Sequence, residues 1–459
     1  MGSFRDLLVF AIVMLSLPAS FKRPFVGLLV FSWLAYMRPQ DLCWSFARDM
    51  RMSFYVAMAM IAGWWANERG RRAFATWDVR TWLMVLLGAL VLLSYAQARD
   101  QAEYVTRYLF EFLKIIVIAL FTSGQIDSRE RFRNMVAMIA VCLAFFGVKG
   151  GVFGVLTGGA TILRGPGGML EDNNDFALAL VMNVPLLWYM GSSERARPFV
   201  YQASRVGIVL TVLTILLTHS RGAFLALVAT AVWIAWRTGN LLRAFGGLFV
   251  SALAFLAFAP RSVLERMSTI GDTTDSSAMA RLQSWKVAFR MIEANPFMGV
   301  GVRNFQSSYL NYAQLARVDA KTTYVAHNSY LQIWAESGTV AFGAYLLLLL
   351  SVFATCRRVY KMGVLRPDLR WAMDYARMME ATTVGFMIGA VFLNRGHFDL
   401  VYHWIALVTS LSSIVGYHWL RRPEAQQAGS RSGSITVAGR SRFGSLPAMV
   451  NGATPRWGR

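Results

Sequence analysis

Two stretches decide the fold, because in each a polar cluster leads into an apolar run: THSRGAFLALVATAVW (Thr218–Trp233) and YVAHNSYLQIWAESGTVAFGAYLLLLL (Tyr324–Leu350). The runs are typical of membrane helices, which need about 20 apolar residues to cross a bilayer core. Arg221 and His327 stand where these runs begin. Ionisable side chains are costly beside lipid, so their presence there indicates a function.

The whole chain has a membrane composition. Of its 459 residues, 56% are hydrophobic and only 15% are charged, whereas soluble domains are about a quarter charged. The apolar segments predicted to span the membrane are 7–19, 25–37, 53–66, 81–97, 108–121, 135–153, 176–190, 206–218, 222–236, 241–258, 338–352, 382–393 and 401–420. The sequence therefore predicts an all-α, polytopic membrane protein. It has 13 spans, or 12 if the first pair forms one kinked or re-entrant unit.

One membrane domain is expected over residues 1–420, with a long helical loop at 259–337. The tail 421–459 is rich in Gly, Ser and Arg and has one acidic residue. Such a segment cannot bury enough apolar surface to fold, so we expect a disordered, basic, cytoplasmic tail.

The net charge of +21 reflects basic loops. Segments 67–72, 127–133, 193–198 and 357–370 are rich in Lys and Arg, which predicts that they face the cytoplasm and meet anionic lipids. Nucleic acid is not expected as a partner. The alternate loops 39–49, 156–175 and 259–328 then lie outside, together with the Ser220–Arg221 turn. The start of the chain resembles a signal peptide, but Lys22, Arg23 and a second apolar run follow, so cleavage is not expected.

The long outer loop holds the strongest site features. The segment 275–297 has the apolar spacing of an amphipathic helix, with Met279, Leu282, Trp285, Ala288, Met291 and Ile292 on one face. A second, weaker helix is predicted at 305–315. Both are expected to lie at the membrane surface.

Arginines gather on the predicted outer side, against the usual trend. They are Arg164, Arg221, Arg261, Arg266, Arg281 and Arg303. Arginine binds phosphate through paired contacts and stays charged, so this set suits a diphosphate or anionic lipids. A single interfacial arginine more often reaches for lipid headgroups.

His327 precedes Asn328, a good helix cap, and the apolar helix beyond. A helix start disfavours imidazolium, so a neutral His327 could accept a proton, and the same helix end favours a nearby phosphate. A lone histidine is more often structural, so this role is a hypothesis.

Several chemistries are missing from the sequence. No Asp-x-Asp pair, zinc-ligand spacing or P-loop is found, and the three cysteines form no framework. No metal or cofactor is therefore expected. The cluster EDNND (Glu171–Asp175) suits a cation or a sugar, or equally a polar turn that caps the helix after it.

Three blocks together resemble the O-antigen ligase family: HSRGAFLAL, RLQSWKVAFRMIEANPFMGVGVRNF and AHNSYLQIWAESG, all within Thr218–Gly338. That family shares its domain with the O-antigen polymerases. The first ~60 residues, with FRDLLVF and YMRPQDLCWSFA, also resemble exosortase-associated O-glycosylation ligases.

The resemblance implies a GT-C-like glycosyltransferase of the bacterial inner membrane. It would need no metal and would act at the periplasmic face. The donor would be a glycan on undecaprenyl diphosphate, and the acceptor a sugar hydroxyl of lipid A–core, which completes lipopolysaccharide. The family's essential residues fall on Arg221, on Arg281 with Arg266 as a rival, and on His327. Arg164 and Arg303 could help to bind the diphosphate, and Ser220, Asn328 and Trp285 would support the site.

Other functions remain open at this stage. An O-antigen polymerase joins two diphosphate-linked glycans, and a protein O-glycosylation ligase uses a protein acceptor. A lipid-linked glycan transporter, a more distant alternative, would place charged residues near the membrane midplane, whereas here they cluster near one rim. The oligomeric state and the sugars cannot be predicted from the sequence.

Overall fold

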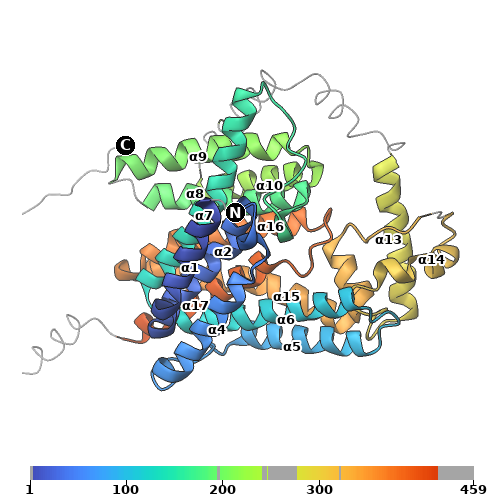
Figure 1. Cartoon of the computed structure of the whole chain (residues 1–459), viewed down its shortest axis with the longest axis horizontal. Helices are drawn as coiled ribbons and strands as arrows, with labels where there is room; N and C mark the ends of the chain where they lie inside the picture. The colour runs from blue at the N-terminus through green and yellow to red at the C-terminus, as the bar shows by residue number, and fades with distance from the viewer. Residues whose placement is uncertain (1–3, 194–196, 240–245, 247–275, 320–321, 422–459) are drawn as a thin grey trace, which may run out of the picture. The chain divides into compact units, whose positions relative to one another are not determined.

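The computed structural model describes residues 4–193, 197–239, 246, 276–319 and 322–421, and the described chain is helical throughout (Figure 1). The long helices of the first half are α1 (Phe4–Lys22), α2 (Pro24–Tyr36), α4 (Met52–Gly63), α5 (Val79–Ala96), α6 (Glu103–Gln125), α7 (Arg129–Leu156) and α8 (Asn173–Ser193). Those of the second half are α9 (Pro198–Leu217), α10 (Arg221–Thr238), α13 (Ser276–Ala294), α14 (Phe305–Leu315), α15 (Ser329–Leu365), α16 (Trp371–Gly389) and α17 (Asp399–Leu420).

Seven of the described helices are long and apolar enough to cross a membrane: α1, α5, α7, α8, α9, α15 and α17. This finding confirms the prediction of an all-α, polytopic membrane protein. Each predicted span overlaps a helix, except 241–258, of which only residue 246 is described. The count of 12 or 13 spans stays a prediction, as does a disordered tail at 421–459, because residues 422–459 are not described.

The loops gather at two ends of the helical bundle. At one end, Arg72 pairs with Asp127 at 2.7 Å and Arg129 lies over the ring of Trp371 at 5.1 Å. At the other end, the Asn173 side chain donates to the Thr218 carbonyl at 2.8 Å, beside Ser220. We call these the Arg72 end and the Ser220 end.

The first helix begins at the Ser220 end. The buried carboxylate of Asp6 accepts hydrogen bonds from the backbone of Ser45 and Ala47, both at 3.1 Å. Helix α1 then runs to Lys22 and α2 returns, so the first apolar pair forms two separate helices joined at Arg23.

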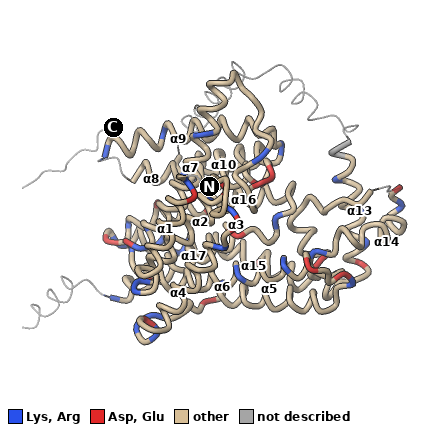
Figure 2. Tube along the Cα trace, viewed as in Figure 1, with Lys and Arg blue, Asp and Glu red and all other residues tan. Residues whose placement is uncertain are grey.

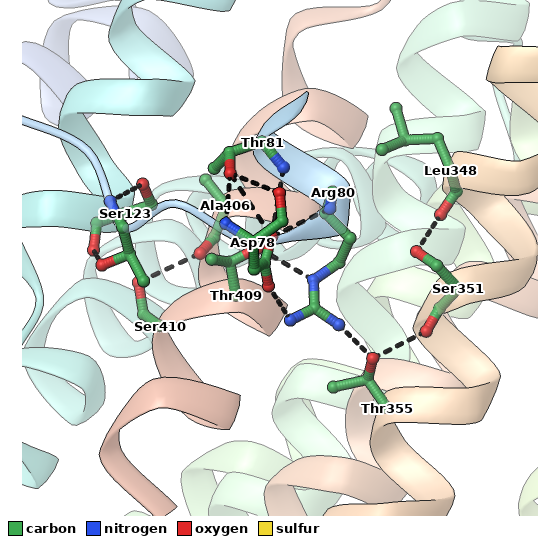
Figure 3. A network of polar contacts seen from close by, with 11 residues as sticks. Asp78, Arg80, Thr81, Ser123, Leu348, Ser351, Thr355, Ala406, Thr409 and Ser410 are labelled. Carbon is green, nitrogen blue, oxygen red and sulfur yellow. Dashed lines mark hydrogen bonds and ion pairs between the residues drawn. The ribbon is translucent and has the colours of Figure 1, made fainter. Parts of the chain in front are cut away.

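A buried arginine fastens three helices near the Arg72 end (Figure 3). Arg80, in the first turn of α5, is 6% exposed and pairs with Asp78. Its guanidinium also donates to Thr409 of α17 at 2.9 Å and to Thr355 of α15. Because each partner comes from a different segment, this network fixes α5, α15 and α17 to one another.

Helices α13 and α14 pack beside the start of α15, beyond the Ser220 ends of α5 and α6 (Figure 1). Their bounds confirm the two helices predicted in the long loop. The buried face of α13 includes Val287, Ala288, Met291 and Ile292, which meet residues of α14 and α15.

The predicted face of α13 was partly wrong. Met279 and Leu282 are 43% and 48% exposed. Helix α13 packs on protein through its second half, so its first half contributes little to the core.

A glycine breaks α15 near the Ser220 end. Gly338 has φ +85°, and a Cβ there would lie 2.0 Å from the carbonyl oxygen of Phe297. Only glycine fits this close approach. The long helix therefore breaks at Gly338, the residue where the predicted span 338–352 begins, and residues 329–337 form a short helix beside the site.

Candidate functional site at the Ser220 end

A tight turn presents Arg221. His219 has φ +56°, which reverses the chain between α9 and α10. The Ser220 hydroxyl accepts from the backbone of Ala223 at 3.3 Å and so caps α10. Arg221 is the first residue of that helix and is half-buried. The predicted supporting role of Ser220 therefore has a structural basis, because this cap fixes the backbone beside Arg221.

His327 stands at a second capped helix start. The Asn328 side chain accepts from the backbone of Tyr330 at 2.9 Å and of Leu331 at 3.0 Å, as expected of a cap. His327, just before it, has φ +47° and is half-buried. Left-handed backbone is uncommon for residues other than glycine, so the surroundings of His327 hold it in a strained conformation.

Strain of this kind gathers near the Ser220 end. Positive φ angles are also found at Arg38, His219 and Arg303, whose neighbours lie at this end. Such residues persist only where the surrounding structure holds them, and they are often found at functional sites. This pattern indicates a functional site at the Ser220 end.

The structure brings Arg281 and His327 together. Arg281 lies on α13, one turn before Trp285, and both side chains are half-buried. Trp285 packs against the cluster formed by α13, α14 and the start of α15. Through this packing, α13 carries Arg281 to the segment that ends at His327.

Burial and the charge of Arg281 lower the pKa of His327 below its ordinary 6.5, whereas Asp172 opposes them. This lowered pKa favours the neutral imidazole near pH 7. The sequence analysis attributed a neutral His327 to the helix start alone. In the structure, burial and the charge of Arg281 also lower its pKa. A neutral histidine beside an arginine can accept a proton while the arginine holds an anion.

Asp172 belongs to the EDNND cluster, and its contacts are those of the predicted helix cap. Its carboxylate accepts from the backbone and the side chain of Asn174, at 2.8 and 3.1 Å. It therefore caps the start of α8. Among the described residues, no three His, Cys, Asp or Glu side chains come together as metal ligands.

A loop that the sequence analysis did not single out borders the site. Residues 390–398 join α16 to α17 and carry Arg395, whose guanidinium forms an ion pair with Asp175 of α8. The backbone of Arg395 donates to the Ser329 hydroxyl at 2.9 Å. Burial opposes the charge of Arg395, but the hydrogen bond that its guanidinium donates to Asp175, together with the charge of that carboxylate, outweighs burial and raises the pKa of Arg395.

Arg303 lies in a neighbouring cluster. It is exposed, and its guanidinium lies over the ring of Tyr108 at 5.0 Å. The Tyr108 hydroxyl in turn contacts Nδ1 of His397 at 3.0 Å. Burial and the charge of Arg303 lower the pKa of His397 to about 3. The lowered pKa favours a neutral His397, and the charge of Arg303 influences this histidine and not His327.

The remaining predicted residues are less central. Arg164 is exposed and forms an isolated β-bridge with Asp172, so its backbone lies beside the site. Arg261 and Arg266, the rival of Arg281, lie outside the described residues. Tyr108 and Arg395 were not predicted from the sequence. They come from segments nearly 300 residues apart, and neither belongs to a local motif.

The fold and this polar site at one end define a multi-pass, all-helical membrane protein. Residues 206–346 match the family described as O-Antigen ligase, which supports assignment of the chain to that family and confirms the resemblance of the sequence blocks. The match supports a function of the ligase or polymerase type, which in general terms implies a lipid-linked glycan donor and a lipid acceptor.

The first half of the chain has a match of its own. Residues 4–194 match a family of unknown function, DUF5935. No curated protein matches the chain. The site uses residues from both matched regions, since Asp172 and Asp175 come from the first, and Arg221, Arg281 and His327 from the second. Arg395 lies in neither.

Proposed function

We propose that the protein is an O-antigen ligase, which transfers a glycan from undecaprenyl diphosphate to a sugar hydroxyl of lipid A–core. One observation carries this proposal: Arg281 acts on a His327 that burial keeps neutral, at the same end of the bundle as Arg221. A base beside an arginine is what transfer from a diphosphate requires.

The reaction would proceed in one displacement. The acceptor oxygen attacks the anomeric carbon as the bond from that carbon to the diphosphate oxygen breaks. The acceptor proton passes to His327, and the diphosphate leaves with its charge held by Arg221 and Arg281. A single displacement inverts the anomeric centre, whereas retention needs a nucleophile that forms a glycosyl intermediate.

The direct test is transfer with purified protein, a lipid-linked glycan and rough lipopolysaccharide. Ligation is expected to yield core lipid that carries the glycan with an inverted linkage. Elongation of one lipid-linked glycan by another, with no capped core, would indicate a polymerase instead. Transfer to a protein would identify a protein O-glycosylation ligase, and movement of the donor across a vesicle without new bonds would identify a transporter.

Arginines could carry the charge on the leaving group without a metal. Transfer is therefore expected to continue in EDTA. Loss of turnover in the chelator, with recovery on adding Mg²⁺ or Mn²⁺, would contradict this part of the proposal.

The proposal also needs the Ser220 end to face the periplasm of an inner membrane. Loop charge predicts this orientation, because the Arg72 end carries the basic loops. Two exposed positions test it: Leu163, 70% exposed near the Ser220 end, and Gly70, where an added Cβ would meet no atom within 4 Å.

A membrane-impermeant thiol reagent is expected to label Leu163→Cys in intact spheroplasts, and Gly70→Cys only after the membrane is opened. The background is low because Cys43, Cys142 and Cys356 are all buried. Cys43 lies in the loop 39–49, which is predicted to face outside, but it is buried and is therefore not expected to label. The reverse pattern of labelling would show the site facing the cytoplasm and would exclude this donor.

A further inference from the structure

The ion pair between Asp175 and Arg395 joins two parts of the site that are distant in sequence. Arg395 belongs to the loop between α16 and α17, and Asp175 to the first turn of α8. Their side chains are 25% and 7% exposed, so water screens this contact little. An ion pair in such a place is costly to break from one side.

On one side, the loop that carries Arg395 is hydrogen-bonded to the start of α15, next to His327. The Ser329 hydroxyl accepts from the backbone of Arg395 at 2.9 Å and donates to the Leu393 carbonyl at 2.8 Å. The backbone of Gly396 donates to the Gln332 side chain at 3.1 Å. The loop is therefore tied to the first turn of α15, immediately after His327 and Asn328.

On the other side, the start of α8, which carries Asp175, is hydrogen-bonded to the turn before Arg221. Asp175 follows Asn173, whose side chain donates to the Thr218 carbonyl in the turn before Arg221. The turn also packs on the loop that carries Arg395, since a Cβ at Gly222 would lie 2.7 Å from Cβ of Phe392. The start of α8 thus holds the backbone that presents Arg221.

We propose that the Asp175–Arg395 ion pair is a positioning element that sets His327 and Arg221 at a fixed distance from each other. This inference rests on the proposed function for the meaning of that distance. It also gives the region of unknown function a role, because Asp175 lies within residues 4–194. That region would be part of the active site and not a separate module.

The test replaces Arg395 and follows two measurements. Misplacing a reacting group by about 1 Å can cost about 100-fold in rate. Arg395→Gln is therefore expected to lower kcat by about that factor and to leave the KM for donor nearly unchanged. Arg395→Lys keeps the charge and is expected to recover most of the rate.

The second measurement does not depend on transfer. Diethylpyrocarbonate modifies neutral imidazole, and mass spectrometry follows its rate at His327. In Arg395→Gln, the loop is released from α8 but keeps its backbone hydrogen bonds to α15, so the loop and the segment around His327 lose a common anchor. Modification of His327 is therefore expected to speed up several-fold. In Arg395→Lys the rate is expected to stay near that of the wild type.

A double-mutant cycle with Asp175→Asn separates a pair from two independent residues. If the two act as one unit, the double variant is no slower than Arg395→Gln alone. The matched control is Glu103→Gln with Arg107→Gln, an ion pair of 2.7 Å near the same end whose side chains are 86% and 73% exposed, respectively. These control variants are expected to behave as the wild type.

The outcomes distinguish the two proposals. A well-folded Arg395→Gln variant with wild-type kcat and wild-type modification of His327 would overturn the positioning role, as would additive effects in the cycle. If the wild type transfers no glycan, the proposed function fails, and the modification rates of the same variants still decide whether the pair positions His327.

Discussion

Arginines serve different purposes at the two ends of the bundle. Near the Arg72 end, Arg80 is 6% exposed and is held by Asp78, Thr355 and Thr409, while Arg237 pairs with Glu380 at 2.8 Å. At the Ser220 end, Arg281 acts on a neutral His327, and the exposed Arg303 lies over an aromatic ring. Arginine fastens helices near the Arg72 end, whereas at the Ser220 end Arg395 fastens a loop to α8 and Arg281 borders the proposed site.

The comparison teaches where loss of charge should matter. An arginine whose donors are used by protein partners contributes to stability, because its removal leaves buried groups unpaired. An arginine that influences a titratable group at a site contributes to chemistry. Charged residues gather at the helix ends (Figure 2). The position of an arginine therefore does not show whether it stabilises the fold or serves the site, and only its contacts distinguish the two roles.

The largest effect is expected for His327→Ala. Loss of a general base costs about 10²–10⁴-fold in rate, so kcat for transfer should fall by that factor, measured with saturating donor and acceptor. His327 is at a loop position outside the packed helices, so the thermal unfolding of the purified variant should be nearly unchanged. Wild-type turnover by a folded variant would exclude His327 as the base.

The second effect concerns donor affinity. Arg221→Lys and Arg281→Lys keep the charge but lose the paired contact with phosphate. Hydrogen bonds to charged groups are worth about 1.5–3 kcal/mol, so donor binding should weaken by about 10–100-fold.

Arg290→Lys is the matched control for this pair of variants, because it lies on the same helix as Arg281, is 51% exposed and pairs with Glu293. Binding of the lipid-linked donor is measured directly, for example by native mass spectrometry. Equal donor affinity in all three lysine variants would contradict the assignment of Arg221 and Arg281.

Much of this site was predictable from the sequence, and the limits have a physical cause. The bounds of α13 and α14 and the caps at Ser220 and Asn328 follow from local patterns of spacing and side-chain type. The contacts of Asp172 and Arg395 do not, because they depend on how α8, α15 and the loop before α17 pack together. The exposed Met279 shows the same limit: periodicity marks an apolar face but does not say how much of it a partner covers.

The third effect is expected near the Arg72 end, and it concerns the free energy of unfolding. Arg80→Met keeps the length of the side chain but removes the guanidinium that donates to Thr355, to Thr409 and to Oδ2 of Asp78. Unsatisfied buried groups cost about 1–3 kcal/mol each, so the variant should unfold at lower denaturant concentration. The folded fraction should keep its kcat. Arg107→Met, at an exposed site, should change neither quantity, and a loss of kcat in Arg80→Met alone would show that the two ends are coupled.

The smallest effect is a shift in pH dependence, and its sign is opposite for two neighbours of His327. Because burial and Arg281 lower the pKa of His327 below 6.5, the neutral base persists at pH 6.5, and kcat should fall only as the pH drops through the lowered pKa. Arg281→Gln removes a cation that lowers this pKa, so the acidic limb of kcat should move to higher pH. Asp172→Asn removes an anion that raises it, so the limb should move to lower pH.

Measuring kcat at saturating donor keeps the weaker binding of the Arg281 variant out of this comparison. Glu171→Gln, an exposed carboxylate next to Asp172, is the control and should leave the limb in place. Arg281 and Asp172 carry opposite charges and both act on the imidazole of His327. The two substitutions should therefore shift the acidic limb of the kcat profile in opposite directions. A limb that moves the same way in both variants, or in neither, would mean that His327 is not the group whose protonation limits transfer.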